Sequence, residues 1–402
     1  MWHAAATTGP RGAVTSEGVQ AVDARQVAAT AAPVAVSPVV RRYDWGSTTY
    51  LQGLLGASVD GQPWAELWLG AHPAGPSPLP GGGTLADRAP DLPFLVKVLA
   101  ADAPLSLQVH PDAARARAGF AREEAAGVGR DEATRSYRDE SHKPELLVAL
   151  EPTDALAGFR PPGQAADALA RLAVPGLGGV TAALRVADEA AALRGGLVAL
   201  LALADQPAVV AAAAAAATTA AEQGGTQAPA LRWVAQLAAR HPTDPGALAP
   251  LLLHLVTLAP GEGLFVPAGT LHAYLAGAGV EVQASSDNVL RAGLTTKHVD
   301  ARQLLAVLDA AARPVPLVHP VPHGPGLAAY PVPVPDFRCW SVEVGAAALA
   351  LPGAGPRLVV AVAGRLRVGD VDVPPGHGAY LEGTAPVVVT GPGRGFVVGA
   401  GG

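Results

Sequence analysis

Two similar turns, 115 residues apart, constrain the fold of this chain more than any other feature of its sequence. The first turn reads Leu258-Ala-Pro-Gly-Glu-Gly-Leu-Phe-Val, and the second reads Val373-Pro-Pro-Gly-His-Gly-Ala-Tyr-Leu. In both copies Pro and Gly form a tight turn that leads into an apolar run with an aromatic residue at the same place. Hairpins of this kind build jelly-roll barrels, so the repeat predicts a mainly β chain with two jelly-roll β-barrels.

The composition changes along the chain in a way that places helices between the barrels. From Val39 to about Glu151, Gly and Pro separate short apolar runs that are typical of strands. Residues 160–257 are instead rich in Ala and Leu at helical spacing, and Asp300 can cap one more helix over 301–311. We therefore expect a flexible N-terminal extension (1–36), a first barrel (37–157 and 251–313), an α-helical insertion domain (158–250) and a degenerate C-terminal barrel (314–402).

Charge and cysteine content exclude several classes of protein. The 402 residues include 28 basic and 34 acidic ones, and this net charge of −6 argues against a general binder of nucleic acid or anionic membranes. The single cysteine, Cys339, rules out an intrachain disulfide framework and fits a reducing compartment. No signal peptide or membrane span is visible, because the most apolar stretch, 197–221, is interrupted by Asp205, Gln206 and Pro207. We expect a cytoplasmic monomer with no nucleic-acid or membrane partner.

The run Leu105-Ser-Leu-Gln-Val-His110 alternates apolar and polar residues. Because side chains alternate along a strand, Ser106, Gln108 and His110 share the face opposite the apolar residues. An amide oxygen and an imidazole two residues apart can reach one metal ion. The alternative is a histidine that lines the barrel and is satisfied by hydrogen bonds.

A second candidate ligand lies in His142-Lys-Pro-Glu145. Lys143 and Glu145 share a strand face, while His142 points the other way. Burying a carboxylate at the start of an apolar strand is costly unless it is paired or binds a metal. An ion pair between Lys143 and Glu145 is therefore the alternative to a metal site.

The segment after the first turn supplies the remaining polar groups. His272 and Tyr274 share a face, and Glu281 and Gln283 follow on the polar side of an apolar strand. At the repeat offset the second copy has Val387 in place of His272. We therefore expect only the first barrel to keep a ligand.

Several motifs together resemble the type I mannose-6-phosphate isomerase family of the cupin superfamily. They occur in the order of that family between about residues 39 and 313, and their joint presence is far more specific than any one of them. The motifs are Tyr43-Asp-Trp-Gly-Ser47, Glu66-Leu-Trp-Leu-Gly-Ala-His-Pro73, Leu105-Ser-Leu-Gln-Val-His-Pro111, His142-Lys-Pro-Glu145, Pro267-Ala-Gly-Thr-Leu-His-Ala-Tyr274 and Ser286-Asp-Asn-Val-Leu-Arg-Ala-Gly293.

The resemblance implies a bicupin fold with a helical insertion and one zinc ion per chain. The implied zinc ligands are Gln108, His110, Glu145 and His272. Catalytic zinc binds nitrogen and oxygen donors and keeps a position open for water or substrate. With one carboxylate and three neutral ligands, the site would retain a positive charge.

The resemblance also implies a reaction, the interconversion of mannose 6-phosphate and fructose 6-phosphate through an enediol. This isomerisation needs a base near C1 and C2 and stabilisation of negative charge on oxygen. We expect Glu281 to transfer the proton and Lys143 to be a second candidate for acid–base or ring-opening work. We expect Arg291 to act in catalysis and bind the sugar phosphate, with further substrate contacts from Ser106, Tyr274 and Asp287.

Some assignments stay open at this point. An ion pair with Asp287 is the alternative for Arg291, and the roles of Glu66 and His72 are not assigned. We expect Lys97 to belong to a buried pair and Lys297 to line the mouth of the cleft.

Two other functions compete with the isomerase. The first is another metal-dependent bicupin enzyme such as an oxygenase, but two His, one Glu and one Gln favour zinc over the His-rich ligand sets suited to iron. The second is a non-catalytic sugar-phosphate-binding bicupin, against which the set of Lys143, Glu281 and Arg291 argues. The sequence does not distinguish mannose catabolism from biosynthesis of mannose donors such as GDP-mannose.

Overall fold

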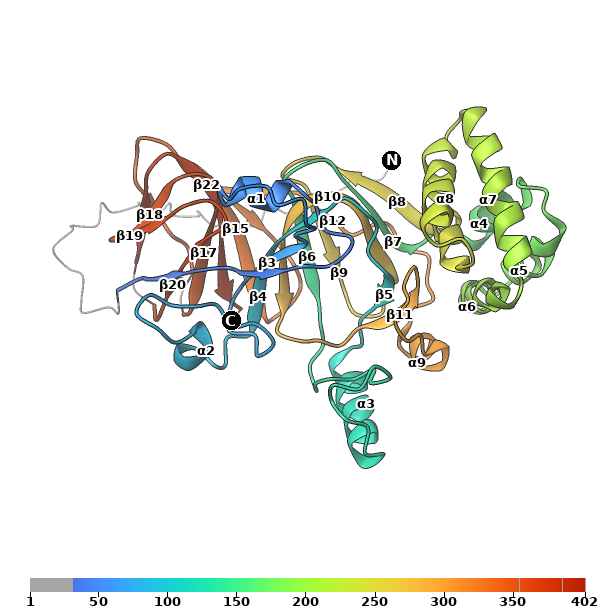
Figure 1. The fold of residues 1–402 in the computed structure, drawn as a ribbon, viewed down its shortest axis with the longest axis horizontal. Helices are drawn as coiled ribbons and strands as arrows, with labels where there is room; N and C mark the ends of the chain where they lie inside the picture. Colours follow the sequence, from blue (N-terminus) through green and yellow to red (C-terminus); the bar gives the residue numbers. More distant parts are fainter. Residues whose placement is uncertain (1–31, 354, 385, 402) are drawn as a thin grey trace, which may run out of the picture.

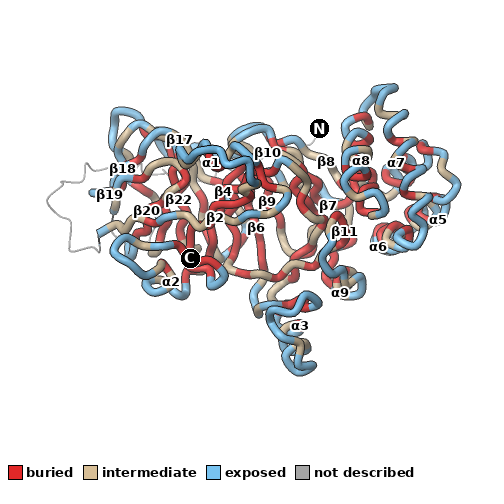
Figure 2. Tube along the Cα trace, viewed as in Figure 1, coloured by how far each residue is buried: buried red, intermediate tan, exposed pale blue. Residues whose placement is uncertain are grey.

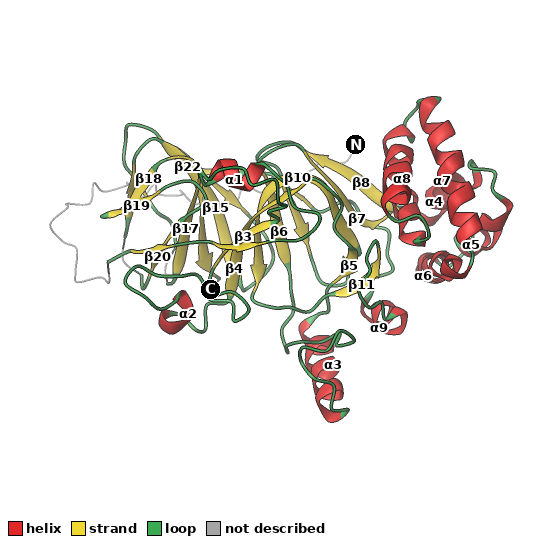
Figure 3. Cartoon of the chain, in the orientation of Figure 1, coloured by secondary structure: helices red, strands yellow, loops and turns green. Residues whose placement is uncertain are grey.

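A computed structural model describes residues 32–353, 355–384 and 386–401. It is mainly β-sheet with several helices, as the sequence predicts. The helices between residues 162 and 240 stand at one end of the molecule, and the C-terminal strands stand at the other (Figures 1 and 3). The predicted extension 1–36 lies outside the described residues as far as residue 31.

The central sheet has 11 strands and carries most of the polar residues singled out above. Its main path runs in the order β12-β9-β6-β10-β4-β3-β2, and β5, β7, β8 and β11 branch from it. The strands are β2 (Val39–Arg41), β3 (Glu66–Leu69), β4 (Phe94–Ala101), β5 (Leu107–Val109), β6 (Glu145–Ala149), β7 (Thr153–Phe159), β8 (Leu253–Leu258), β9 (Gly263–Val266), β10 (His272–Ala284), β11 (Leu290–Gly293) and β12 (Leu317–Val318).

The C-terminal strands form a smaller sheet of 4 strands and, together with β1 from the start of the described chain, a second sheet of 7 strands. The order of the larger one is β1-β20-β17-β22-β15-β14-β13, with β1 (Val34–Val36), β13 (Val321–Gly324), β14 (Leu327–Tyr330), β15 (Phe337–Val344), β17 (Arg357–Gly364), β20 (Gly378–Leu381) and β22 (Gly393–Ala400). The smaller one has the order β16-β21-β18-β19, with β16 (Leu349–Ala350), β18 (Leu366–Val368), β19 (Val371–Val373) and β21 (Val388–Thr390).

Alternation along the strands divides the interior into layers. On β4 the side chains of Val96 and Val98 join one hydrophobic cluster, whereas Leu99 joins another. The first cluster also contains Phe337 and Leu358 from the C-terminal sheet, so it fills the space between the two large sheets. The buried strands form a continuous band along the molecule (Figure 2). The opposite face of β4 therefore points away from this layer, and it is there that the strand can present polar groups to a cavity.

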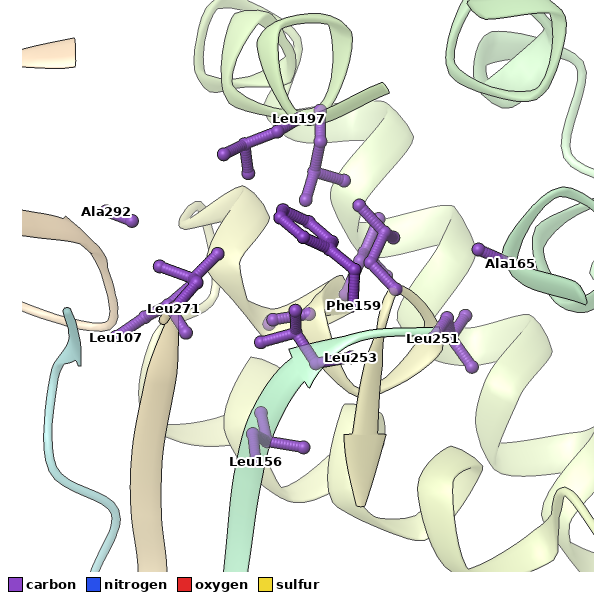
Figure 4. Close-up of a cluster of buried hydrophobic side chains, with 14 of the residues drawn as sticks. Leu107, Leu156, Phe159, Ala165, Leu197, Leu251, Leu253, Leu271 and Ala292 are labelled. Atoms are coloured by element: carbon purple, nitrogen blue, oxygen red, sulfur yellow. The ribbon is translucent and has the colours of Figure 1, made fainter. Parts of the chain in front are cut away.

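Helices confirm the change of composition after residue 160. The described helices are α1 (Tyr50–Leu54), α2 (Leu85–Arg88), α3 (Ala113–Ala125), α4 (Pro162–Ala170), α5 (Gly178–Ala183), α6 (Glu189–Leu201), α7 (Pro207–Glu222), α8 (Ala228–Arg240) and α9 (Ala301–Val307), with 3-10 turns η1 (Pro175–Leu177), η2 (Ala202–Asp205) and η3 (Pro245–Leu251). Phe159 at the end of β7 packs with Leu197 of α6 and Leu251 of η3 in one buried cluster (Figure 4). This shared core fixes the helices against the 11-stranded sheet.

Three local predictions were wrong. The flexible extension was expected to reach residue 36, but Val34–Val36 form β1 on the edge of β20, where Val36 is buried. The β-rich stretch 39–151 contains the 13-residue helix α3, which Asp112 caps by accepting from the Arg115 N–H. Asp300 caps α9 as expected, but the helix ends at Val307 rather than 311, because the Asp309 N–H donates to the carbonyl of Gly269 instead.

A β-bulge interrupts the longest strand, β10. Opposite β7 the pairing shifts by one residue between Tyr274 and Ala276, so β10 carries one extra residue there. Gly277 follows with φ of +113°, and a Cβ at this position would lie 2.5 Å from Thr153 Oγ1. Only glycine fits this close approach.

Within the described ranges no single helix is long and apolar enough to cross a membrane. The helices Glu189–Asp205 and Pro207–Glu222 reach that length and composition only as a pair, which is bent by 110°.

Candidate metal centre

Strand pairing brings three distant polar residues into one row. Gln108 of β5 lies directly opposite His272 of β10 on one side and opposite Arg291 of β11 on the other. Directly opposed residues share a face of the sheet. The row therefore joins a predicted metal ligand on β5, a second one on β10 and the predicted substrate-binding cation on β11.

His110, Glu145 and His272 form the centre of the site. One ligand atom from each lies within 4.8 Å of the others, and all three residues are buried. Glu145 lies between the rings, with Oε1 3.2 Å from His110 Nε2 and Oε2 3.4 Å from His272 Nε2. Gln108 faces the adjoining cavity and lies opposite His272, which places the fourth predicted ligand at the edge of the cluster.

The unsatisfied atoms of this cluster fit a metal ion. His110 Nε2, His272 Nε2 and Glu145 Oε2 are buried and have no hydrogen-bond partner. The other ring nitrogens do have partners: His110 Nδ1 is 2.7 Å from the carbonyl of Asn288, and His272 Nδ1 is 2.9 Å from that of Thr270. A carbonyl can only accept, so each Nδ1 carries the proton and each Nε2 presents a lone pair, as metal-binding histidines do.

Electrostatics favour the metal-binding protonation states of His110 and Glu145. Burial, followed by the nearby Lys143 ammonium, lowers the pKa of His110 to about 4. Burial alone would raise the pKa of Glu145, but Lys143 and His110 outweigh it and hold that pKa well below its usual range. The Lys143 Nζ donates to Glu145 Oε1 at 2.6 Å. The ion pair between Lys143 and Glu145, considered in the sequence as the alternative to a metal site, is therefore present within the candidate metal cluster.

A second buried charge cluster lies next to the metal cluster. Lys97 of β4 is directly opposite Glu281 of β10, and its Nζ is 2.8 Å from Glu281 Oε2 and 3.5 Å from Glu66 Oε1. Burial opposes the ammonium, yet the carboxylates of Glu281 and Glu66 raise the pKa of Lys97. Burial raises the pKa of Glu281, and Lys97 opposes that rise. Lys97 is thus the buried pair member that the sequence predicts.

A cavity of about 370 Å³ opens beside both clusters, within the size range of small-molecule sites. Most of the predicted site residues line it: Ser106, Gln108, Lys143, Glu145, Tyr274, Glu281, Asp287 and Arg291. Tyr274 contributes a buried hydroxyl without a partner, and burial, with Glu145 and Glu281, raises the pKa of that phenol well above its usual value. The phenol therefore stays neutral and can donate to a ligand.

Cations gather at one side of this cavity. Arg291 and Lys297 both line it, as expected for Lys297 at the cleft mouth. Burial, followed by the nearby charge of Arg138, lowers the pKa of Arg291. Burial, followed by Arg291 and Arg138, lowers the pKa of Lys297. These cations repel one another, and a bound anion would relieve that repulsion.

Asp287 does not pair with Arg291 in the described part of the chain. Its carboxylate instead lies 3.5 Å from His72 Nε2. His72 Nδ1 accepts from the Ala74 N–H at 3.2 Å, so Nε2 carries the proton toward Asp287. His72 and Asp287 therefore form one unit at the wall of the cavity, and Arg291 is available for a ligand.

The sequence did not reveal two contributions from distant segments. His241 follows α8 in the helical segment and lines the cavity, although nothing in its local sequence indicates this. The second contribution is from Glu66, which accepts from Trp68 Nε1 at 2.7 Å, and this hydrogen bond orients its carboxylate beside Lys97. Glu66 and Trp68 both lie on β3 and belong to a motif noted in the sequence, but the sequence does not indicate that Glu66 contacts Lys97 of β4.

Comparison with known proteins identifies similar sequences and structures over most of the chain. Residues 82–162 match the family model of the type I phosphomannose isomerase catalytic domain. The chain is 35% identical over 383 residues to mannose-6-phosphate isomerase of Escherichia coli, covering 88% of this chain and 96% of that protein. It is 32% identical to the Rattus norvegicus enzyme over 77% of this chain and 81% of that protein. A crystal structure of mannose 6-phosphate isomerase bound with zinc and yttrium superposes with a TM-score of 0.83 and 34% identity, covering 92% of this chain and 100% of that one.

Proposed function

The chain belongs to the type I mannose-6-phosphate isomerase family, and from this we propose that it interconverts mannose 6-phosphate and fructose 6-phosphate in the cavity described above. The observation that carries the proposal is the arrangement of His110, Glu145 and His272, whose unpartnered buried atoms face one another beside a cavity with a cationic side. The competing oxygenase and binding-protein functions have no support among the relatives reported above.

We propose zinc as the metal, held by Gln108, His110, Glu145 and His272. Two imidazoles and one carboxylate are ligands that zinc prefers, and the amide oxygen of Gln108 is placed to complete the set. Related isomerase structures are zinc-bound. When bound, zinc would supply Lewis-acid stabilisation of negative charge on a sugar oxygen.

Glu281 is the proposed base for proton transfer between C1 and C2 of the open-chain sugar. Its carboxylate lines the cavity next to the metal cluster, and burial raises its pKa toward the range useful for a base at neutral pH. Lys97 holds Oε2 at 2.8 Å and so fixes the orientation of the carboxylate. Taking a proton from one carbon and returning it to the other is the step of the enediol pathway that requires such a fixed group.

The other proposed roles follow from position. Arg291, with Lys297 beside it, binds the phosphate or a polarised sugar oxygen, because a guanidinium can make two parallel hydrogen bonds to such groups. Ser106, Tyr274 and Asp287 are proposed substrate contacts on the wall of the same cavity. Lys143 is proposed for acid–base or ring-opening work, although its bond to Glu145 ties it to the metal cluster.

We also propose the bicupin architecture and the domain boundaries predicted from the sequence, with the N-terminal extension now ending before β1 (Val34–Val36). The two turns support this, because Gly261 and Gly376 both have positive φ and precede strands that begin at Gly263 and Gly378. The strands that follow the two turns therefore begin 115 residues apart, the same offset as the turns. A monomeric state and a cytoplasmic location remain predictions.

A coupled assay tests the proposed function. Mannose 6-phosphate is supplied, and the formation of fructose 6-phosphate is followed with and without a metal chelator. We expect turnover that the chelator abolishes and added zinc restores. Turnover that is insensitive to the chelator would contradict the metal site, and absence of turnover in the zinc-loaded protein would contradict the isomerase.

A further inference from the structure

The two histidines of the metal cluster are oriented by different parts of the chain. His272 Nδ1 bonds to the carbonyl of Thr270, two residues away in the same turn. His110 Nδ1 bonds instead to the carbonyl of Asn288, which is 178 residues away in sequence. The orientation of His110 therefore depends on how firmly the loop between β10 and β11 is held.

Asp139 holds that loop. Its Oδ1 accepts from Ser286 Oγ at 2.8 Å and from Asn288 Nδ2 at 3.1 Å, and its Oδ2 accepts from the Asp287 N–H at 2.7 Å. One carboxylate thus binds three consecutive residues of the loop. Asp139 belongs to the segment between α3 and β6, so the contact joins two parts of the chain that are about 147 residues apart in sequence.

The Asn288 side chain completes the connection. Its Nδ2 donates to the carbonyls of Asp139 and Ser141 at 2.9 and 2.8 Å, and its Oδ1 accepts from the Arg138 N–H at 2.7 Å. Asn288 is fully buried, and both ends of its amide are satisfied. A fully satisfied buried network of this kind specifies one geometry, because any displacement leaves polar atoms without partners.

We propose that Asp139 and Asn288 are positioning residues that orient the metal ligand His110, with Asp139 acting through the loop 286–288. The proposal rests on the metal site of the proposed function but not on the reaction. Partners that orient a metal-binding histidine typically change metal affinity by about 10- to 100-fold when they are removed. We therefore expect Asp139 to influence zinc affinity although it is not itself a ligand.

The test is the affinity of the full-length protein for Zn²⁺, measured by competition with a chromophoric chelator. Asp139→Asn removes one carboxylate acceptor, and we expect it to weaken zinc binding by about tenfold or more. Glu140→Gln is the matched control, because it removes the same charge from the neighbouring exposed position. We expect the affinity of that control to be unchanged.

A double-mutant cycle separates positioning from general stability. On a His110→Ala background, Asp139→Asn should cause no further loss of zinc affinity, whereas on a His272→Ala background the loss should persist. Equal losses on both backgrounds, or a folded Asp139→Asn protein with unchanged affinity, would overturn the proposal. If that variant does not fold, Ser286→Ala leaves Asp139 intact and removes the hydroxyl that donates to Asp139 Oδ1 and accepts from the Asn288 N–H. It should weaken zinc binding by about fivefold, and unchanged affinity would again overturn the proposal. A wild-type protein that binds zinc but does not isomerise the sugar would refute the proposed function alone.

Discussion

Replacing Lys97 by methionine should destabilise the protein in a way that depends on pH. The Lys97 ammonium lies between Glu281 and Glu66, at 2.8 and 3.5 Å, and the three side chains are only 8%, 4% and 8% exposed. Met keeps the length of the side chain and removes the charge. The carboxylates of Glu281 and Glu66 then lie buried without the ammonium that bridges them.

The magnitude follows from the cost of breaking a buried ion pair, about 3–5 kcal/mol. One pKa unit corresponds to about 1.4 kcal/mol, so this loss equals a rise of roughly 2–4 units in the pKa of a carboxylate. Glu281 carries most of this rise, because burial already raises its pKa and only Lys97 and, more weakly, Lys143 oppose the rise.

The sign of the pH dependence is fixed by the direction of that rise. In the variant, folded Glu281 binds a proton more tightly than the unfolded chain does, so stability is retained at low pH and lost as pH rises through the folded pKa. The loss relative to wild type should therefore be small at about pH 5 and approach its full size at about pH 8.

Urea unfolding of the zinc-saturated protein at both pH values measures this effect. Lys297→Met is the control, because Lys297 is partly exposed at the mouth of the cavity, outside the cluster of Lys97, Glu281 and Glu66. Its loss should change stability by no more than about 0.5 kcal/mol. The double variant Lys97→Met/Glu281→Gln should regain part of the loss at the higher pH. A loss of equal size at both pH values, with no recovery in the double variant, would refute the argument.

Four further outcomes are expected. Glu281→Gln should lower turnover by at least about 100-fold while zinc content stays near one per chain, and near-normal turnover would remove Glu281 from the role of base. Arg291→Ala should lower kcat/KM for mannose 6-phosphate by about 10- to 100-fold, as loss of a charged hydrogen bond does, and an unchanged value would exclude the contact. Removal of metal by a chelator should lower the melting temperature. Zinc at a hundredfold excess over its Kd should raise the free energy of unfolding again by about 2.7 kcal/mol. A melting temperature that does not change with zinc would contradict the proposed metal cluster. His142 Nε2 is 2.9 Å from Asp336 Oδ1, and this hydrogen bond raises the pKa of His142. The pair therefore stabilises the fold fully below the unfolded pKa of about 6.5. Its contribution disappears as pH rises through the folded pKa. Asp336→Asn should therefore destabilise the protein more at about pH 6 than at about pH 8.5, and an equal effect at both would contradict this linkage.

Much of the candidate site could be predicted because its residues obey local rules. The alternation in Leu105–His110 places Gln108 and His110 on the polar side, and the two-residue spacing of Lys143 and Glu145 predicts the ion pair that the structure contains. The helical spacing of 160–257 likewise indicates helices without any knowledge of their neighbours.

The remaining features depend on contacts between distant segments. The pairing of Lys97 with Glu281 follows from the register of β4 against β10, which no local pattern in either strand determines. The partner of Asp287 is His72, 215 residues earlier, rather than the nearby Arg291. Helix α9 ends early for the same kind of reason, because Gly269 competes for a backbone N–H that the local sequence would leave to the helix.

The extra residue in β10 has a consequence for the whole site. Tyr274 has an even number and Glu281 an odd one, so in an uninterrupted strand they would lie on opposite faces of the sheet. Both nevertheless line the same cavity, while Val280 and Val282 pack between the two sheets. The shift between Tyr274 and Ala276 exchanges the faces once, and Gly277 makes room for it. Deleting one residue here would turn Glu281 and Gln283 into the hydrophobic layer and place valines in the cavity. The proposed base and the candidate metal cluster therefore lie together only because β10 carries one extra residue.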